Sequence, residues 1–290
     1  MSLIQIITEQ TMATNKSNST SRSLNENSSL PTKLLNGSAT IWFTSAVLGQ
    51  WIFVYYILKF YGGHAITGNF SEWNNGMPNG HVPGDSMGNI AVSLHLLFAV
   101  IIIGGGALQL IPKIRSKFPR FHRVNGRIYI YASILTSIAG IYMIWTRGTV
   151  GGLPQHIGVT VDAVLIITFG ILSIRHAVSG NIVKHREWAL RMFMAVSAVW
   201  FYRVILMFWL SVNNGPVGFD FETFRGPFLT FLAFGQYLVP LLFLELYLYS
   251  RRNKRGILKT GMAIILFLLT LAMALGIFAA TNGLWDIVLH

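Results

Sequence analysis

Seven long stretches of the chain are apolar and almost free of charge, and polar segments separate them. Each has about the 17–25 residues that a helix needs to cross a bilayer. Lipid tolerates only helices and closed barrels, and these stretches are too continuous for alternating barrel strands. The pattern predicts an all-α, polytopic transmembrane bundle of about seven spans, at residues 40–60, 89–111, 128–146, 157–174, 188–210, 228–249 and 260–280.

Basic residues collect in every second gap between the predicted spans. The gap after the second span contains Lys113, Arg115, Lys117, Arg120, Arg123 and Arg127, and the gaps after the fourth and sixth are also basic. The alternate gaps hold only Arg147 and Arg225 between them. Since basic loops stay in the cytoplasm, the pattern predicts a cytoplasmic N-terminus and an external C-terminus at His290.

Composition agrees with a membrane protein. Only 11% of residues are charged and 53% are hydrophobic, whereas soluble domains contain about 25% charged residues. The net charge of +12 follows topology, so it indicates orientation and contact with anionic lipid rather than nucleic-acid binding. The absence of cysteine excludes disulfides, thiolate metal sites and cysteine nucleophiles. We predict a polar, disordered cytoplasmic tail at 1–39 and a transmembrane domain at 40–290.

The predicted outer loop, residues 61–88, is unusually long for a compact protein. It is rich in Gly and Asn and contains potential ligand side chains, namely His64, Glu72, Trp73, Met77, His81, Asp85 and Met87. Three interpretations remain open: a flexible surface loop, a lid, or a weak metal-binding loop. The spacing of these side chains matches no established metal motif.

Ionisable side chains inside the predicted spans are the strongest functional signal, because such groups are costly in hydrocarbon. His95, Asp162 and Arg203 all lie roughly 7–11 Å below the outer surface, at 1.5 Å per residue. Gln50 and Gln236 are near the same depth. The sequence therefore predicts a polar pocket that opens outward beneath the loop. Structurally, Arg203 and Asp162 would form a buried ion pair; functionally, the pocket would bind a carboxylate, phosphate or quinone.

Three segments carry a resemblance to a known family. They are Leu94-His-Leu through Pro112 with its Gly-rich turn, Phe121-His-Arg-Val-Asn-Gly-Arg-Ile-Tyr129, and His185-Arg-Glu-Trp-Ala-Leu-Arg191 followed by Arg203. Together they resemble bacterial multi-pass membrane proteins of domain of unknown function 2306, over roughly residues 89–210. The resemblance implies a bacterial cytoplasmic-membrane protein with a central bundle at 89–210. It supports the His and Arg residues of these motifs for testing, and it implies no activity.

Histidines in a helical bundle could also ligate haem b. His95 has no histidine partner at its own depth, and His156 is the nearest candidate. His122 and His185 could pair on the inner side, or they could form an interfacial cluster that contacts lipid phosphate. The function expected is therefore binding of a small ligand or redox cofactor, haem b or quinone, in the outer pocket. A transporter gated by protonation of His95 and Asp162, and a purely structural role, are the alternatives.

Overall fold

The computed structural model describes residues 29–285 of the chain, which contain helices and no strand. The long helices are α2 (Leu30–Ile57), α5 (Ser86–Leu110), α7 (Pro119–Arg147), α8 (Gly152–Val178), α9 (Ile182–Val196), α10 (Ala198–Asn213), α11 (Pro227–Arg252) and α12 (Gly256–Gly283). Short helices connect them: η1 (Leu58–Gly62), α3 (Gly63–Ile66), η2 (Phe70–Glu72), α4 (Trp73–Gly76) and α6 (Pro112–Lys117).

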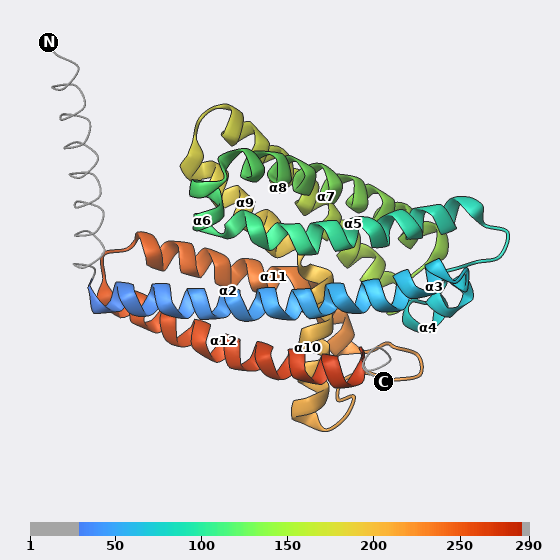
Figure 1. Cartoon of the computed structure of the whole chain (residues 1–290). Helices are drawn as coiled ribbons and strands as arrows, with labels where there is room; N and C mark the ends of the chain where they lie inside the picture. The colour runs from blue at the N-terminus through green and yellow to red at the C-terminus, as the bar shows by residue number, and fades with distance from the viewer. Residues whose placement is uncertain (1–28, 286–290) are drawn as a thin grey trace, which may run out of the picture.

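The predicted number of spans agrees with the structure. Six helices are long and apolar enough to cross a membrane, and the pair α9 and α10 makes up to seven if it forms one span. That pair differs from the prediction of one continuous fifth span at 188–210. A break at Ser197 turns α10 by 53° from α9, and α10 lies across the bundle rather than along it (Figure 1). The membrane depth predicted for Arg203 assumed a continuous helix, so it does not hold beyond Ser197.

The first helix also begins earlier than predicted. Leu30 starts α2, with Pro31 in the first turn, where a proline without an N–H group is well tolerated. The last ten residues of the predicted tail are thus helical, and the tail's residues 1–28 lie outside the described part. The polar positions that suggested a tail, such as Asn36, belong to the end of a helix that is longer than its apolar stretch.

The helices form two groups that share α11. Neighbours α5, α7, α8 and α9 pack in sequence, while α2 packs on α12 and α12 on α10. We call the end of the bundle with α6 and the α11–α12 turn the basic end, and the end with α3 and α4 the opposite end (Figure 1). The largest cluster of buried apolar side chains is centred on α2, α10 and α12. It lies mostly outside the predicted central bundle.

Candidate functional site

The segment between α2 and α5 packs on the opposite end of the bundle, and we use the name lid for its residues 63–85. Trp73 anchors it, with 3% of its surface exposed and its Nε1 donating to the Tyr61 carbonyl at 3.0 Å. At Gly76 an added Cβ would lie 2.5 Å from the Tyr61 hydroxyl and 2.9 Å from that of Tyr56. The lid backbone therefore rests directly on two tyrosine hydroxyls, which favours the lid over a flexible loop.

The potential metal ligands of this segment have other partners. The His81 ring stacks on Phe70, and the Glu72 carboxylate accepts from the Asn75 amide at 2.8 Å. Asp85 forms an ion pair with Arg147. No group of three or more His, Cys, Asp or Glu side chains with metal-site geometry occurs in the described residues. The geometry gives no support to a metal-binding loop.

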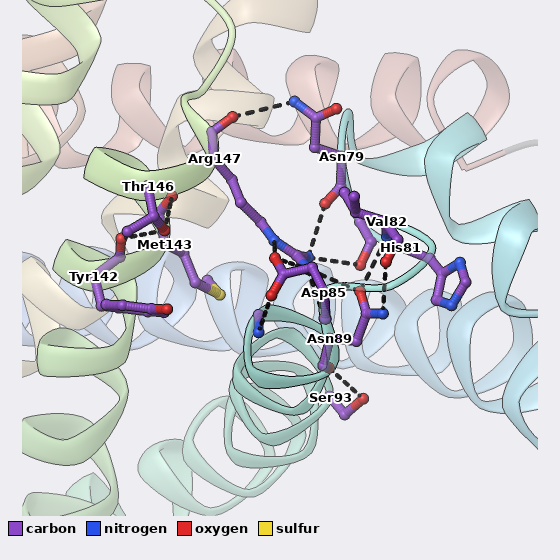
Figure 2. A network of polar contacts seen from close by, with 12 residues as sticks. Asn79, His81, Val82, Asp85, Asn89, Ser93, Tyr142, Met143, Thr146 and Arg147 are labelled. Carbon is purple, nitrogen blue, oxygen red and sulfur yellow. Dashed lines mark hydrogen bonds and ion pairs between the residues drawn. The ribbon is translucent and has the colours of Figure 1, made fainter.

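Arg147 clamps the lid to α5 and α7 (Figure 2). Its Nε and Nη2 donate to Asp85 Oδ2 at 2.9 and 2.6 Å, and Nη2 also donates to Asn89 Oδ1 at 2.8 Å. Its Nη1 donates to the carbonyls of Asn79 and Gly80. In the sequence, Arg147 contributes only to the predicted topology. The clamp had one signal in the sequence: Arg147 lies in a predicted outer gap with few charges, and Asp85 lies in the long loop predicted on the same side of the membrane.

The clamp should respond to acid. A backbone N–H bond from Gly88 and the Arg147 guanidinium hold the pKa of Asp85 below its usual value. A lowered folded-state pKa means that the stabilisation is complete above the unfolded pKa of about 3.9 and is lost as pH falls through the lower folded value. We expect the lid to stay closed from neutral pH to about 4 and to open below that.

An environment-sensitive fluorophore on Ser71→Cys, an exposed lid position in a chain without native cysteine, would report this transition. Asp85→Asn is the matched control, because it should remove the acid response and leave the lid loose at neutral pH. A transition centred above the ordinary carboxyl range would contradict the prediction.

Arg203 lies near Tyr56 and Tyr61, the two tyrosines on which the lid rests. The Arg203 guanidinium lies over the Phe53 ring, 5.1 Å from its centroid, and Nη1 donates to the Val199 carbonyl at 3.0 Å. Arg203 is within electrostatic range of His95 and Tyr56. The His95 ring lies against Gly140 of α7, and its enclosed Nδ1 has no hydrogen-bond partner within the described chain. We keep the name outer pocket for the predicted ligand site around Arg203 and His95.

Asp162 does not belong to the outer pocket. It is 5% exposed and faces α11, where Tyr237 is within electrostatic range. The three ion pairs found in residues 29–285 do not include Arg203 with Asp162. The ion pair expected in the structural interpretation is therefore wrong. The bend at Ser197 is the reason, because it turns Arg203 toward α2 and away from α8.

The two glutamines also have separate positions. Gln50 of α2 donates to the Ser197 hydroxyl at 2.9 Å, and that hydroxyl donates to the Phe193 carbonyl at 2.8 Å. Gln50 thus contacts the break between α9 and α10. Gln236 is 1% exposed and donates to the carbonyl of Ala233, within its own helix, at 2.8 Å. Neither amide extends the outer pocket in the described arrangement.

Two of the candidate histidines lie at the basic end. The His185 Nδ1 lies 3.0 Å from the Ser173 carbonyl oxygen and 3.1 Å from the Ser173 hydroxyl, which joins α9 to α8. The His122 Nδ1 accepts from the Gln109 amide at 3.0 Å in the orientation that satisfies the bonds of that amide. The two rings are within electrostatic range of each other. Both motifs that contain these histidines therefore connect neighbouring helices.

The haem hypothesis requires free ring nitrogens. A ligating histidine usually donates one N–H to a carbonyl and keeps the other nitrogen free. His185 meets that condition in the tautomer that donates from Nδ1 to the Ser173 carbonyl, whereas in His122 the Gln109 amide donates to Nδ1, which favours a proton on Nε2. His156 accepts the Thr149 N–H at its Nε2, with 3.2 Å between the two nitrogens. The described tautomers thus do not fit a bis-histidine haem.

The other charged side chains of the motif at 185–191 connect α9 to α11. Arg191 donates from Nε and Nη2 to the two oxygens of Glu245, at 2.6 and 2.9 Å, and lies over the Trp188 ring. Glu187 accepts from Arg252 at 2.8 Å. These residues are accounted for by helix packing.

Comparison with known proteins supports the family resemblance. A family model described as Predicted membrane protein (DUF2306) matches residues 92–245. The match extends beyond the predicted 89–210 into the sixth span and ends at Glu245, the partner of Arg191. No curated protein and no solved structure matches the chain. Because the match covers more than half of the sequence, this chain belongs to the predicted membrane protein family DUF2306.

Proposed function

We propose that this integral membrane protein binds a small lipid-soluble molecule in the outer pocket, through an acceptor oxygen of quinone or carboxylate type. The proposal places it in a bacterial cytoplasmic membrane, with its basic end in the cytoplasm. The ligand lies under the lid, between α2, α5 and α10. The unpaired state of Arg203 carries the proposal.

An arginine within a membrane span is costly unless it has a partner. Arg203 has a cation–π contact with Phe53 and one backbone acceptor, and no carboxylate among residues 29–285 pairs with it. A cation–π contact contributes about 2 kcal/mol at a desolvated site, which is less than the insertion cost of an arginine at about 2.5–3.5 kcal/mol. A ligand oxygen would supply the missing interaction.

The groups around Arg203 narrow the ligand class. The planar guanidinium suits a carbonyl or carboxylate oxygen. The enclosed Nδ1 of His95 can donate to or accept from a second polar group. Aromatic side chains lie near Arg203, namely Phe53 and Tyr56, and in this proposal the lid covers the ligand. A quinone combines a flat apolar ring with two carbonyl oxygens and meets these conditions.

The transport alternative has weaker geometric support. Gating by joint protonation of His95 and Asp162 requires both groups to act on one bound anion, and Asp162 faces α11 rather than Arg203. Haem b has one supporting observation, the Nδ1 bond of His185 to a backbone carbonyl. A bound haem would show a Soret band and sharp reduced bands in the visible spectrum of the purified protein. That result would overturn the quinone proposal and favour a haem site at the basic end, near His185.

Arg203→Gln should weaken binding of a quinone with a short isoprenoid tail by at least about tenfold, equivalent to about 1.4 kcal/mol, because glutamine cannot replace a charge-assisted hydrogen bond. Arg203→Lys should retain part of the affinity, since it keeps the charge but not the planar fork. Quinone binding is measured in mild detergent by quenching of tryptophan fluorescence. The same measurement with a fatty acid of similar length shows whether the site prefers a quinone carbonyl or a carboxylate.

Two controls make the result specific. Arg225→Gln removes an arginine at the same end of the bundle that is outside the pocket, and should leave affinity unchanged. Asp286→Asn tests an acidic residue that adjoins Trp285 in sequence but lies outside the described residues. The proposal would be overturned if folded Arg203→Gln bound quinone and fatty acid as well as the wild-type chain does. It would also be overturned if Asp286→Asn and Arg203→Gln lost the same stability and neither variant changed ligand binding.

A further inference from the structure

A cavity lies nearer the basic end, and its lining residues on α10 do not include Arg203. Its volume is about 810 Å³, and it is enclosed by α2, α9, α10, α11 and α12 together with the end of α5. Its walls are mainly apolar and aromatic, with Trp42, Phe43 and Phe243 among them. Pro240 lines it from within α11. Ligand cavities typically have about 300–1,000 Å³, so this cavity can take a ligand of lipid size.

Two arginines stand at the basic end of this cavity. Arg186 of α9 and Arg251 of α11 both line it, and both also line an adjoining pocket of about 280 Å³. They are close enough for their like charges to interact. Neither takes part in an ion pair of the described chain.

The acidic side chains nearby already have partners. Glu187 pairs with Arg252 and Glu245 pairs with Arg191. The positive charge of Arg186 and Arg251 is therefore left without a counter-charge from residues 29–285. Two adjacent guanidinium groups without carboxylates form a site for an external anion, and phosphate oxygens fit their donor geometry.

The cavity also borders the bilayer. Leu48 and Trp51 of α2 line it and are 55% and 45% exposed, and on a membrane span such exposure means contact with acyl chains. A ligand can therefore enter sideways from the lipid phase. The site combines lateral access, an apolar interior and a cationic end at headgroup level.

We propose that this cavity binds one anionic phospholipid from the leaflet at the basic end. Its phosphate lies between Arg186 and Arg251, and an acyl chain extends along α2 into the apolar interior. This site is independent of the outer pocket, because its lining residues do not include Arg203 or His95. The bound lipid would hold α9 and α11 together where their like charges otherwise repel.

Native mass spectrometry in mild detergent tests the proposal, with phosphatidylglycerol and phosphatidylcholine of equal chain length as probes. We expect the wild-type chain to retain phosphatidylglycerol at least tenfold better. The double variant Arg186→Gln/Arg251→Gln should lose this preference. The matched control Arg120→Gln/Arg123→Gln removes two exposed arginines from the same end and should keep it. Ala272→Phe, which fills the cavity without changing charge, should reduce retention of both lipids.

Three outcomes would overturn the proposal. Equal retention of the two lipids by the wild-type chain would mean ordinary boundary lipid. The preference for phosphatidylglycerol could survive in Arg186→Gln/Arg251→Gln and be lost in Arg120→Gln/Arg123→Gln. That result would place the headgroup elsewhere on the basic end. Binding of inorganic phosphate that displaces the lipid and disappears in Arg186→Gln/Arg251→Gln would indicate a site for a free anion.

Discussion

Gly158→Ala lowers the midpoint of thermal unfolding by roughly 4–8 °C, the shift expected for about 2 kcal/mol in a chain of this size. Gly158 lies at a close contact between α8 and α11, and an added Cβ would collide with the Ala233 carbonyl of α11. The obstacle is backbone, so no side-chain rotation can relieve it, and the two helices must separate. Small residues at helix contacts have this role in membranes.

The same contact sets the environment of Asp162. Asp162 is one turn after Gly158 on α8, and Tyr237 is one turn after Ala233 on α11, so each pair shares a helix face. Separation of the helices would therefore admit water to a buried carboxyl group, which adds to the loss of packing. Stability is followed by a thermal melt in detergent, with the size-exclusion profile as a check on the folded fraction.

Gly104→Ala is the matched control, because no atom lies within 4 Å of an added Cβ at that mid-helix position of α5. Its melting point should be unchanged or slightly higher, since alanine favours the helix over glycine. Equal melting points for the two variants would show that the α8–α11 contact is looser than described.

Arg147→Gln should open the lid and raise the reaction rate of a partly buried cysteine on the lid by at least about tenfold, since the variant removes charge-assisted hydrogen bonds to several partners at once. The Arg147 side chain is only 7% exposed, so water replaces those bonds poorly in the closed lid. Met77→Cys provides the reporter, because Met77 is partly buried against the main apolar cluster and the chain has no other cysteine.

The reporter reacts with a bulky maleimide in the Met77→Cys background. Arg225→Gln in the same background is the control, since Arg225 is at the same end and makes no contact with Asp85. Asp85→Asn should raise the rate less than Arg147→Gln, because the arginine keeps its bonds to Asn79, Gly80 and Asn89. A rate in Arg147→Gln equal to that in Arg225→Gln would show that the Arg147 side chain does not hold the lid, which would contradict the prediction.

The sequence by itself determined the membrane class, the number of spans and the family. Those features depend on local quantities: an apolar stretch must be long enough to cross a bilayer, and basic residues collect in alternate gaps. The motifs from Leu94 to Arg203 lie within the matched region. The sequence also singled out His95 and Arg203, because ionisable groups inside apolar spans are conspicuous.

Only the tertiary structure decided which of those polar groups meet. Equal depth on three helices suggested one cluster of His95, Asp162 and Arg203, but depth says nothing about the direction in which each side chain points. The break at Ser197 rotates α10, so Arg203 faces Phe53 while Asp162 faces α11. The lid clamp of Asp85 and Arg147, and the cavity end formed by Arg186 and Arg251, join residues more than sixty positions apart. Such contacts depend on how helices rotate and pack against one another, which no local pattern records.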